Sequence, residues 1–241
     1  YPVEAIRRGR NWRLSGQESA SRLMSLSKLL GAITALVATL LASACSGADG
    51  RTTSGQAVGG STSSVPNDSQ LEVPQVQRPL DVSRFVDNPC KLVDQRVIER
   101  LGDFDPGKPD VTSDAAKNLI GPRCSWFHKT ESTVHFGVSI GLPHQKHADP
   151  ERKGLAGIYG SRKSGRIDYF QPVTLPGHED YPAVIAADQQ EIDEGSCPVY
   201  IGVANDLTVI ASFSNGSSPE QACPAAQQVA SAVLDTLKSV N

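Results

Sequence analysis

The chain has 241 residues and a formal net charge of −3, with 39% hydrophobic and 20% charged residues. Its first 44 residues are net basic, so the remainder is more acidic than the chain as a whole. An acidic domain lacks the clustered positive charge that nucleic-acid binding requires, and we therefore exclude nucleic acid as a partner.

An apolar run over residues 29–41 is followed by small residues and then by Cys45. An apolar core of this length, placed after Lys28 and before small residues and a cysteine, is typical of a lipoprotein signal peptide. It is shorter than the roughly 20 apolar residues that a membrane-spanning helix needs. We predict a signal peptide over Met24–Ala44 and lipidation of Cys45, with palmitate among the acyl chains. An ordinary secretory signal cut nearby is the alternative.

The segments on either side of the signal peptide follow from this prediction. Residues 1–23 contain no methionine and several arginines, so they are either a basic leader or a start assigned too far upstream. Acyl chains contribute roughly 0.8 kcal/mol per buried methylene, which would hold the exported protein at the outer face of the cell membrane. Residues 45–77 are rich in Gly, Ser, Thr and Pro and contain no aromatic residue, which predicts a flexible tether. The folded domain is expected over 78–241.

The apolar pattern of this domain predicts helices and strands in chain order. Asn88 and Pro89 are the expected N-cap and first-turn residue of a first helix, which Gly102 ends. The elements expected next are a polar loop (103–118), a hairpin of two strands (124–127 and 134–140), a short helix (147–158) and four more strands (166–173, 181–187, 198–204 and 208–214).

The last predicted element is a helix that begins at Ser218. Ser218-Pro219-Glu220-Gln221 has the pattern of a capping box with proline at the first helical position. Apolar residues then recur at helical spacing from Ala222 to Leu237. The order of elements predicts a single α+β domain, in which N- and C-terminal helices pack on an antiparallel sheet.

Four cysteines remain once Cys45 is assigned to lipidation: Cys90, Cys124, Cys197 and Cys223. An even number in an exported domain predicts two disulfides, for which three pairings are possible. We expect Cys90–Cys124 and Cys197–Cys223, because each pair closes a short loop, and each bridge should stabilise the domain by about 3 kcal/mol. No pair has the Cys-x-x-Cys spacing of zinc or thioredoxin-type sites.

Several short motifs occur in an order that is familiar from one family. They are Arg78-Pro79-Leu80-Asp81, Asn88-Pro89-Cys90, Cys124-Ser125-Trp126, Leu175-Pro176-Gly177-His178, Cys197 and Cys223. In this order the domain resembles the actinobacterial envelope lipoproteins that carry domain of unknown function 3558, the LprB-like proteins. The resemblance implies a surface-exposed, lipid-anchored domain held by disulfides, and it implies no particular activity.

Two clusters of histidine and acidic residues are candidates for a metal site or for acid–base chemistry. His144 and His147 lie close to Asp149 and Glu151, and imidazole and carboxylate are ligands that suit zinc. Prolines interrupt this segment, so we expect a solvated loop with no metal and no cofactor. The triplet His178-Glu179-Asp180 combines a base with two carboxylates, but its place after a glycine predicts a polar turn.

Two further groups of residues are candidates for binding. Trp126, Phe127 and Phe136 are the heaviest apolar side chains, and they either pack in the core or line a ligand pocket. A local basic patch is either a solvated loop or a contact for anionic lipid or wall polymer; it consists of Arg152, Lys153, Arg162, Lys163 and Arg166.

These observations predict an exported, lipid-anchored envelope protein that acts by binding and is not an enzyme. No Gly-x-Ser-x-Gly nucleophile motif is present in the sequence. The expected partner, besides the membrane that holds the anchor, is another envelope protein or an amphiphilic ligand. The first alternative is a lipid or glycolipid carrier with an internal cavity, and the second is a hydrolase or a metal-dependent enzyme.

Overall fold

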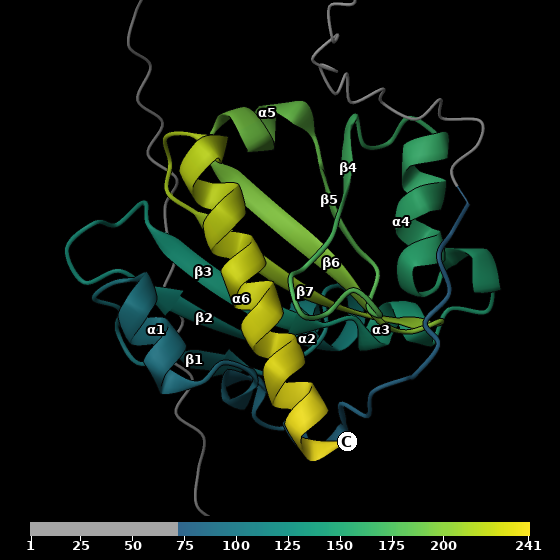
Figure 1. The fold of residues 1–241 in the computed structure, drawn as a ribbon, viewed down its shortest axis with the longest axis horizontal. Coiled ribbons are helices and arrows are strands. Elements are labelled where there is room, and N and C mark those ends of the chain that lie inside the picture. Colours follow the sequence, from purple (N-terminus) through teal and green to yellow (C-terminus); the bar gives the residue numbers. More distant parts are fainter. Residues whose placement is uncertain (1–71) are drawn as a thin grey trace, which may run out of the picture. The chain divides into compact units, whose positions relative to one another are not determined.

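Seven antiparallel strands form one twisted sheet in the computed structural model, which describes residues 72–241 (Figure 1). In chain order the strands are β1 (Lys108–Asp110), β2 (Arg123–Phe127), β3 (His135–Ile140), β4 (Tyr169–Val173), β5 (Ala183–Ala187), β6 (Ser196–Ala204) and β7 (Leu207–Ser214). Their order across the sheet is β1-β2-β3-β7-β6-β5-β4. The predicted signal peptide, Cys45 and most of the predicted tether lie outside the described residues.

Six α-helices and three short 3₁₀ segments accompany the sheet in this part of the chain. The helices are α1 (Gln95–Leu101), α2 (Asp114–Asn118), α3 (Leu142–Gln145), α4 (Gly154–Lys163), α5 (Gln189–Asp193) and α6 (Pro219–Val240). The 3₁₀ segments are η2 (Ser83–Phe85), η3 (Pro89–Leu92) and η4 (Pro150–Arg152). The predicted α+β class with an antiparallel sheet is confirmed.

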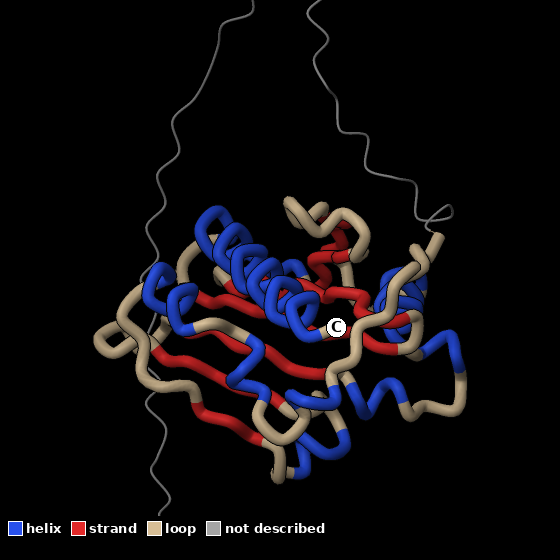
Figure 2. Tube along the Cα trace, turned by 60° about the horizontal axis from the view of Figure 1, so that its bottom comes forward, coloured by secondary structure: helices blue, strands red, loops and turns tan. Residues whose placement is uncertain are grey.

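The two faces of the sheet are covered differently. The long helix α6 lies along one face (Figure 2), where the inward residues of the central strands alternate with outward ones. The apolar side of α6 that packs there consists of Ala226, Val229, Val233, Leu234 and Leu237. On the other face α4 packs Leu155 and Tyr159 against Val184 and Ala186 of β5. All five residues of β5 are buried as a result.

The first predicted helix is divided into two pieces. Residues Pro89–Leu92 form η3, Val93 is extended, and α1 begins only after Asp94, whose carboxylate accepts a hydrogen bond from the Arg96 N–H. Asn88 is the N-cap residue of η3 and Pro89 its first residue, as predicted, although the Asn88 side chain makes no capping hydrogen bond. Leu92 is fully buried and Cys90 is joined to β2, and these tertiary contacts hold the first turn apart from α1. Gly102 ends α1 as predicted, with a φ of 148°.

Two other regions differ from the prediction in the bounds of their elements. The predicted polar loop contains β1 and α2, because Ser113 caps α2 by accepting a hydrogen bond from the Ala116 N–H. The short helix expected at 147–158 is replaced by η4 and α4; Pro150 starts the first turn, and α4 begins at Gly154. Helix α6 begins at Pro219 with Ser218 as its N-cap residue, as predicted, but the Ser218 side chain makes no capping bond; Asn215 Oδ1 accepts from the N–H groups of Ser217 and Ser218 just before the helix.

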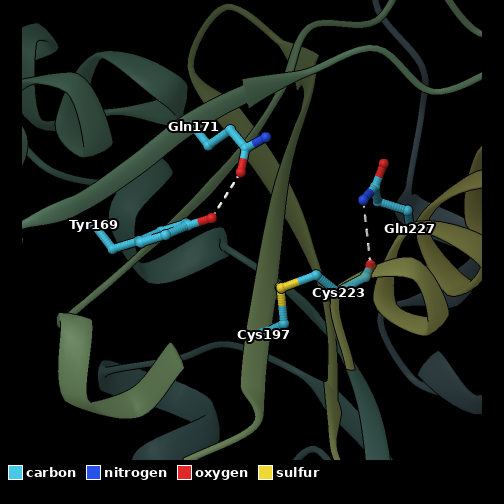
Figure 3. The surroundings of a disulfide bond; sticks show 5 residues. All are labelled: Tyr169, Gln171, Cys197, Cys223 and Gln227. Carbon is cyan, nitrogen blue, oxygen red and sulfur yellow. Dashed lines mark hydrogen bonds between the residues drawn. A yellow bond between two sulfur atoms is a disulfide. The ribbon is translucent and has the colours of Figure 1, made fainter. Parts of the chain in front are cut away.

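Both predicted disulfides are confirmed. Cys90–Cys124 joins η3 to β2, and Cys197–Cys223 joins β6 to the beginning of α6 (Figure 3). They tie the sheet to the chain segments that cover it on the α6 side. Among residues 72–241, no helix has both the length and the apolarity that crossing a membrane would demand.

The two edge strands each carry a proline. β1, at one edge, has Pro109 opposite Cys124, and β4, at the other edge, has Pro172 opposite Val184. Proline offers no backbone N–H to a neighbouring strand, which is why it is tolerated in sheets mainly at their edges.

Candidate functional site

A groove of about 1120 Å³ lies on the face of the sheet that α6 does not cover, and we call it the sheet groove. Its floor is made by outward residues of β2, β3, β7 and β6, and one of its walls is α4. Leu119 and Ile120, which follow α2, also line it.

The strand register explains the depth of the groove. Ser125, Gly137, Ser212 and Pro198 lie side by side in one row across four strands. A Cβ atom added to Gly137 would lie 3.7 Å from Ser125 Oγ and 3.6 Å from Ser212 Oγ. The two hydroxyls therefore flank the open space above Gly137. Because every side chain in this row is small, the floor lies low between its walls.

The hydroxyl groups on the floor have no protein partner among residues 72–241. Ser125, Ser139, Ser212 and Tyr200 use their side-chain oxygens in no hydrogen bond within that part of the chain, and none of these oxygens is buried away from solvent. Burial raises the pKa of Tyr200, and the carboxylate of Glu191 raises it further. The phenol therefore stays protonated and able to donate at neutral pH. The floor is a set of hydroxyls available to a ligand.

The α4 wall is also built from small residues. Gly157, Gly160 and Ser161 line the groove. A Cβ atom added to Gly157 would lie 2.7 Å from the Arg152 carbonyl oxygen, so this glycine lets η4 pack closely against α4. Cationic side chains lie at the C-terminal end of the same wall, where Lys163 and Arg166 line the groove and Arg166 donates to Ser161 Oγ at 3.2 Å.

The Leu119–Ile120 wall is apolar. Leu119 is 64% exposed and Ile120 is 39% exposed, although large apolar side chains of a folded domain are usually covered. The groove thus combines hydroxyls on its floor, cations on one wall and exposed apolar carbon on another.

The model of a family described as protein of unknown function (DUF3558) matches residues 40–236. The chain belongs to this family. No match was found among curated proteins or among solved structures. The match contains all seven strands of the DUF3558 domain, both disulfides and every residue of the sheet groove.

The DUF3558 domain divides the three predicted pocket residues between two faces of the sheet. Trp126 is 2% exposed and Phe136 is 0% exposed, and their rings stack at 4.6 Å in the core below α6. Phe127 is 40% exposed on the opposite face of β2, where it stacks on His135. The three rings therefore do not line one pocket, because neighbouring residues of a strand point to opposite faces.

The histidines of the first predicted cluster do not come together around a common point. His144 lines the sheet groove, whereas His147 Nδ1 accepts a hydrogen bond from the Asp149 N–H at 3.1 Å. Within residues 72–241, no three side chains of His, Cys, Asp or Glu are grouped as metal ligands would be.

The triplet at 178–180 lies in turns, as predicted, but His178 is buried there and not solvated. His178 is only 5% exposed; its Nε2 lies 3.2 Å from Asp235 Oδ1, and its Nδ1 lies 3.4 Å from Lys238 Nζ. Glu179 instead accepts a hydrogen bond from the Gly177 N–H, and Asp180 pairs with Arg78. His178 therefore attaches this loop to α6, on the side of the sheet away from the groove.

A second cavity, of about 800 Å³, lies over α1 and α6. Its lining combines the apolar Val97, Pro176, Pro224 and Ala232 with the polar Arg100, Gln227, Gln228, Ser231 and Asp235. It is smaller than the sheet groove and lacks a row of unbonded hydroxyls beside exposed apolar side chains. We therefore place the candidate site in the sheet groove.

The floor residues were missed by the sequence analysis. The available signal was that serine or glycine occupies the central outward positions of β2 and β3, where charged residues are common on a solvated sheet face; these are Ser125, Gly137 and Ser139. Alternation identifies which residues point outward, but it does not show that α4 stands beside them.

Asp110 holds Arg123 at the rim of the groove. Its carboxylate accepts hydrogen bonds from the hydroxyl and N–H of Ser113, and it lies 2.9 Å from an Arg123 guanidinium nitrogen. The Ser113 hydroxyl is the main cause that lowers the pKa of Asp110 below its usual 3.8, followed by the Ser113 N–H; Arg123 lowers it further.

We expect Asp110→Asn to make the free energy of unfolding depend less on pH below about pH 5. Because the folded pKa is lowered, the stabilisation from Asp110 is complete above about pH 4 and is lost as pH falls through the folded value. Urea unfolding at pH 5, 4 and 3 measures this: the wild type should lose more stability over the range than the variant. Asp87→Asn, at an exposed residue without these bonds, is the control and should follow the wild type. Equal slopes for the wild type and Asp110→Asn would contradict the assignment.

Proposed function

We propose that this DUF3558 protein is a lipid-anchored protein of the outer face of the cell membrane that binds an amphiphilic ligand in the sheet groove. Export by a signal peptide over Met24–Ala44 and acylation of Cys45 supply the anchor, as in the actinobacterial LprB-like lipoproteins that the sequence resembles. The sheet groove is the observation that carries the binding function.

The chemistry of the groove matches the two parts of an amphiphile. The unbonded hydroxyls of Ser125, Ser139 and Ser212 offer hydrogen bonds to a hydroxyl-bearing headgroup. Leu119 and Ile120 offer apolar surface to a chain, at about 25 cal/mol per Å² of surface removed from water. The volume is in the range of sites that hold small molecules.

Binding is supported over catalysis by the surroundings of the floor serines. A serine nucleophile needs a base that takes its proton through a hydrogen bond. Ser125, Ser139 and Ser212 have no such hydrogen bond within residues 72–241. Their arrangement suits recognition of a ligand that is released unchanged.

The position of the groove also distinguishes this proposal from a carrier with an internal cavity. The space between the sheet and α6 is filled by buried side chains, including Phe136, Ile201, Leu234 and Leu237. The sheet groove lies on the other face and opens to solvent. A ligand there stays accessible to a second protein or to the membrane.

Native mass spectrometry of the protein purified from the membranes of its host tests the proposal. We expect a polypeptide mass that begins at acylated Cys45, together with a non-covalently bound amphiphile. Ser212→Leu places a large side chain in the middle of the floor and should lower the bound fraction at least tenfold. Ser231→Leu, on α6 and in the second cavity, is the matched control and should leave it unchanged.

Each part of the proposal has its own contradicting result. A chain that retains Met24–Ala44 without acylation overturns the lipid anchor. A Ser212→Leu protein that carries as much ligand as the wild type overturns the sheet groove as the site, and a bound protein in place of an amphiphile identifies a protein partner.

A further inference from the structure

We infer that the ligand of the sheet groove is anionic, and that Lys163 and Arg166 hold its charge at the C-terminal end of α4. This inference rests on the proposed function and names the class of ligand: an amphiphile with a hydroxylated headgroup that carries a carboxylate or phosphate.

The charges that line the groove are unevenly neutralised. Four cationic side chains line it, Arg123, Arg152, Lys163 and Arg166, as do three acidic ones, Asp149, Glu151 and Glu191. Arg123 is paired with Asp110. Arg152 has no ion pair within residues 72–241 either, but it belongs to η4, where Glu151 and the cap residue Asp149 are its neighbours in sequence. The remaining cations, Lys163 and Arg166, lie at the other end of α4.

Lys163 and Arg166 have no carboxylate partner within residues 72–241. The side chain of Lys163 makes no hydrogen bond or ion pair in that part of the chain, and Arg166 uses its guanidinium only to donate to Ser161 Oγ. Two unpaired cations beside a cavity are notable in a chain whose net charge is negative. An arginine fork and a lysine ammonium together suit a carboxylate or phosphate, which they bind by charge-assisted hydrogen bonds.

The backbone brings the two cations to the same place. Gly165, with a φ of 68°, turns the chain back at the end of α4, and the Arg166 N–H donates to the Ser161 carbonyl at 2.9 Å. The C-terminal end of a helix carries partial negative charge, which stabilises nearby cations before any ligand arrives. The hydrogen bond to Ser161 Oγ holds the Arg166 guanidinium beside the groove, so this cation does not depend on the ligand for its position.

The rest of the groove sets the orientation of such a ligand. The hydroxyls of Ser125 and Ser212 lie in one row across β2, β3 and β7. The α4 wall stands beside β7 and β6, and the Leu119–Ile120 wall leads into β2, so the row lies between the two walls. An anionic group on Lys163 and Arg166 places the hydroxylated part of the headgroup over this row and directs an acyl chain toward Leu119 and Ile120.

Three probes that differ by one chemical part test the inference. Dodecyl glucuronide has the carboxylate, the hydroxyls and the chain; dodecyl glucoside lacks the carboxylate; and free glucuronate lacks the chain. They are titrated below their critical micelle concentrations by calorimetry into the segment Ser61–Asn241. Its residues 72–241 contain both hydrophobic clusters and both disulfides, so we expect the segment to fold on its own.

We expect dodecyl glucuronide to bind at least tenfold more tightly than dodecyl glucoside at low salt. The double variant Lys163→Gln/Arg166→Gln should weaken glucuronide binding about tenfold and leave glucoside binding unchanged. The matched control Arg84→Gln/Lys91→Gln removes the same charge at exposed residues of η2 and η3 and should bind both probes as the wild type does.

The outcomes separate this inference from the proposed function. Equal affinity for the two alkyl probes, with Ser212→Leu abolishing both, overturns the anionic ligand and leaves the proposed function standing. Free glucuronate binding as tightly as dodecyl glucuronide overturns the amphiphile and shows a site for small anions. No binding of any probe overturns the inference and the proposed groove together.

Discussion

Replacing Cys197 and Cys223 with alanine is expected to lower the free energy of unfolding by about 3 kcal/mol. The bridge closes a loop with a sequence separation of 26 residues, so its loss frees the unfolded chain. It also joins β6 to the first turns of α6, directly before Pro224. Proline inside a helix cannot donate its backbone hydrogen bond, so this part of α6 is weak by itself.

Local contacts around the bridge indicate which part of the domain its removal will destabilise. The Gln227 side chain donates to the Cys223 carbonyl at 3.3 Å (Figure 3), which supports the helix after Pro224. Cys197 is fully buried, so alanine there leaves unfilled space as well. Without the bridge we expect the beginning of α6 to separate from the sheet before the rest of the domain unfolds.

Guanidinium unfolding of the oxidised proteins measures this effect. The control is Cys90→Ala/Cys124→Ala, which opens a loop with a sequence separation of 34 residues and should cost a similar amount through chain entropy. Hydrogen exchange of the first turns of α6 should increase only in the Cys197/Cys223 variant. A loss below about 1 kcal/mol would contradict the stabilising role of this bridge.

Gly121→Ala is expected to cost about 3 kcal/mol or more, because strain and overlap occur at the same residue. Gly121 has a φ of 98°, and an added Cβ would lie 1.8 Å from the carbonyl oxygen of Ile140. The next residue, Pro122, accepts a hydrogen bond from the Ile140 N–H. A shift of this segment therefore disturbs the start of β2, the end of β3 and the Leu119–Ile120 wall of the groove.

Gly165→Ala measures the effect of backbone strain without the steric overlap that Gly121→Ala adds. Gly165 also has a positive φ, of 68°, but a Cβ there would meet nothing within 4 Å. It should cost only the left-handed backbone term, about 1 kcal/mol. The midpoints of thermal unfolding of both variants provide the comparison. If Gly121→Ala and Gly165→Ala are equally stable, the contact with Ile140 is not a constraint on the fold.

Local patterns in the sequence were enough to predict the strands of the sheet, the helix α6 and the two disulfides. Alternation over 134–140 and 208–214 predicted strands that become β3 and β7, and the proline-started pattern after Ser218 predicted α6. The disulfide pairing followed from the shortness of the two loops. These features depend on residues that are near each other in the chain.

Features that depend on distant residues were not predictable in this way. Asn88 precedes η3 and Asp94 precedes α1, and the division of the one predicted helix depends on the burial of Leu92 and on the Cys90–Cys124 bridge. The sheet groove depends on where α4 stands relative to β6 and β7, and no local pattern near Ser125 or Ser212 contains that information.

The prolines at the two sheet edges have a consequence for crowding. Proteins tethered to one surface meet their neighbours at high local concentration, and an open strand edge would then serve as a template for intermolecular β-structure. Pro109 and Pro172 interrupt the backbone donors in the middle of each edge strand. For a domain anchored as proposed above, we therefore expect these edges to resist edge-to-edge joining when copies are packed in one plane.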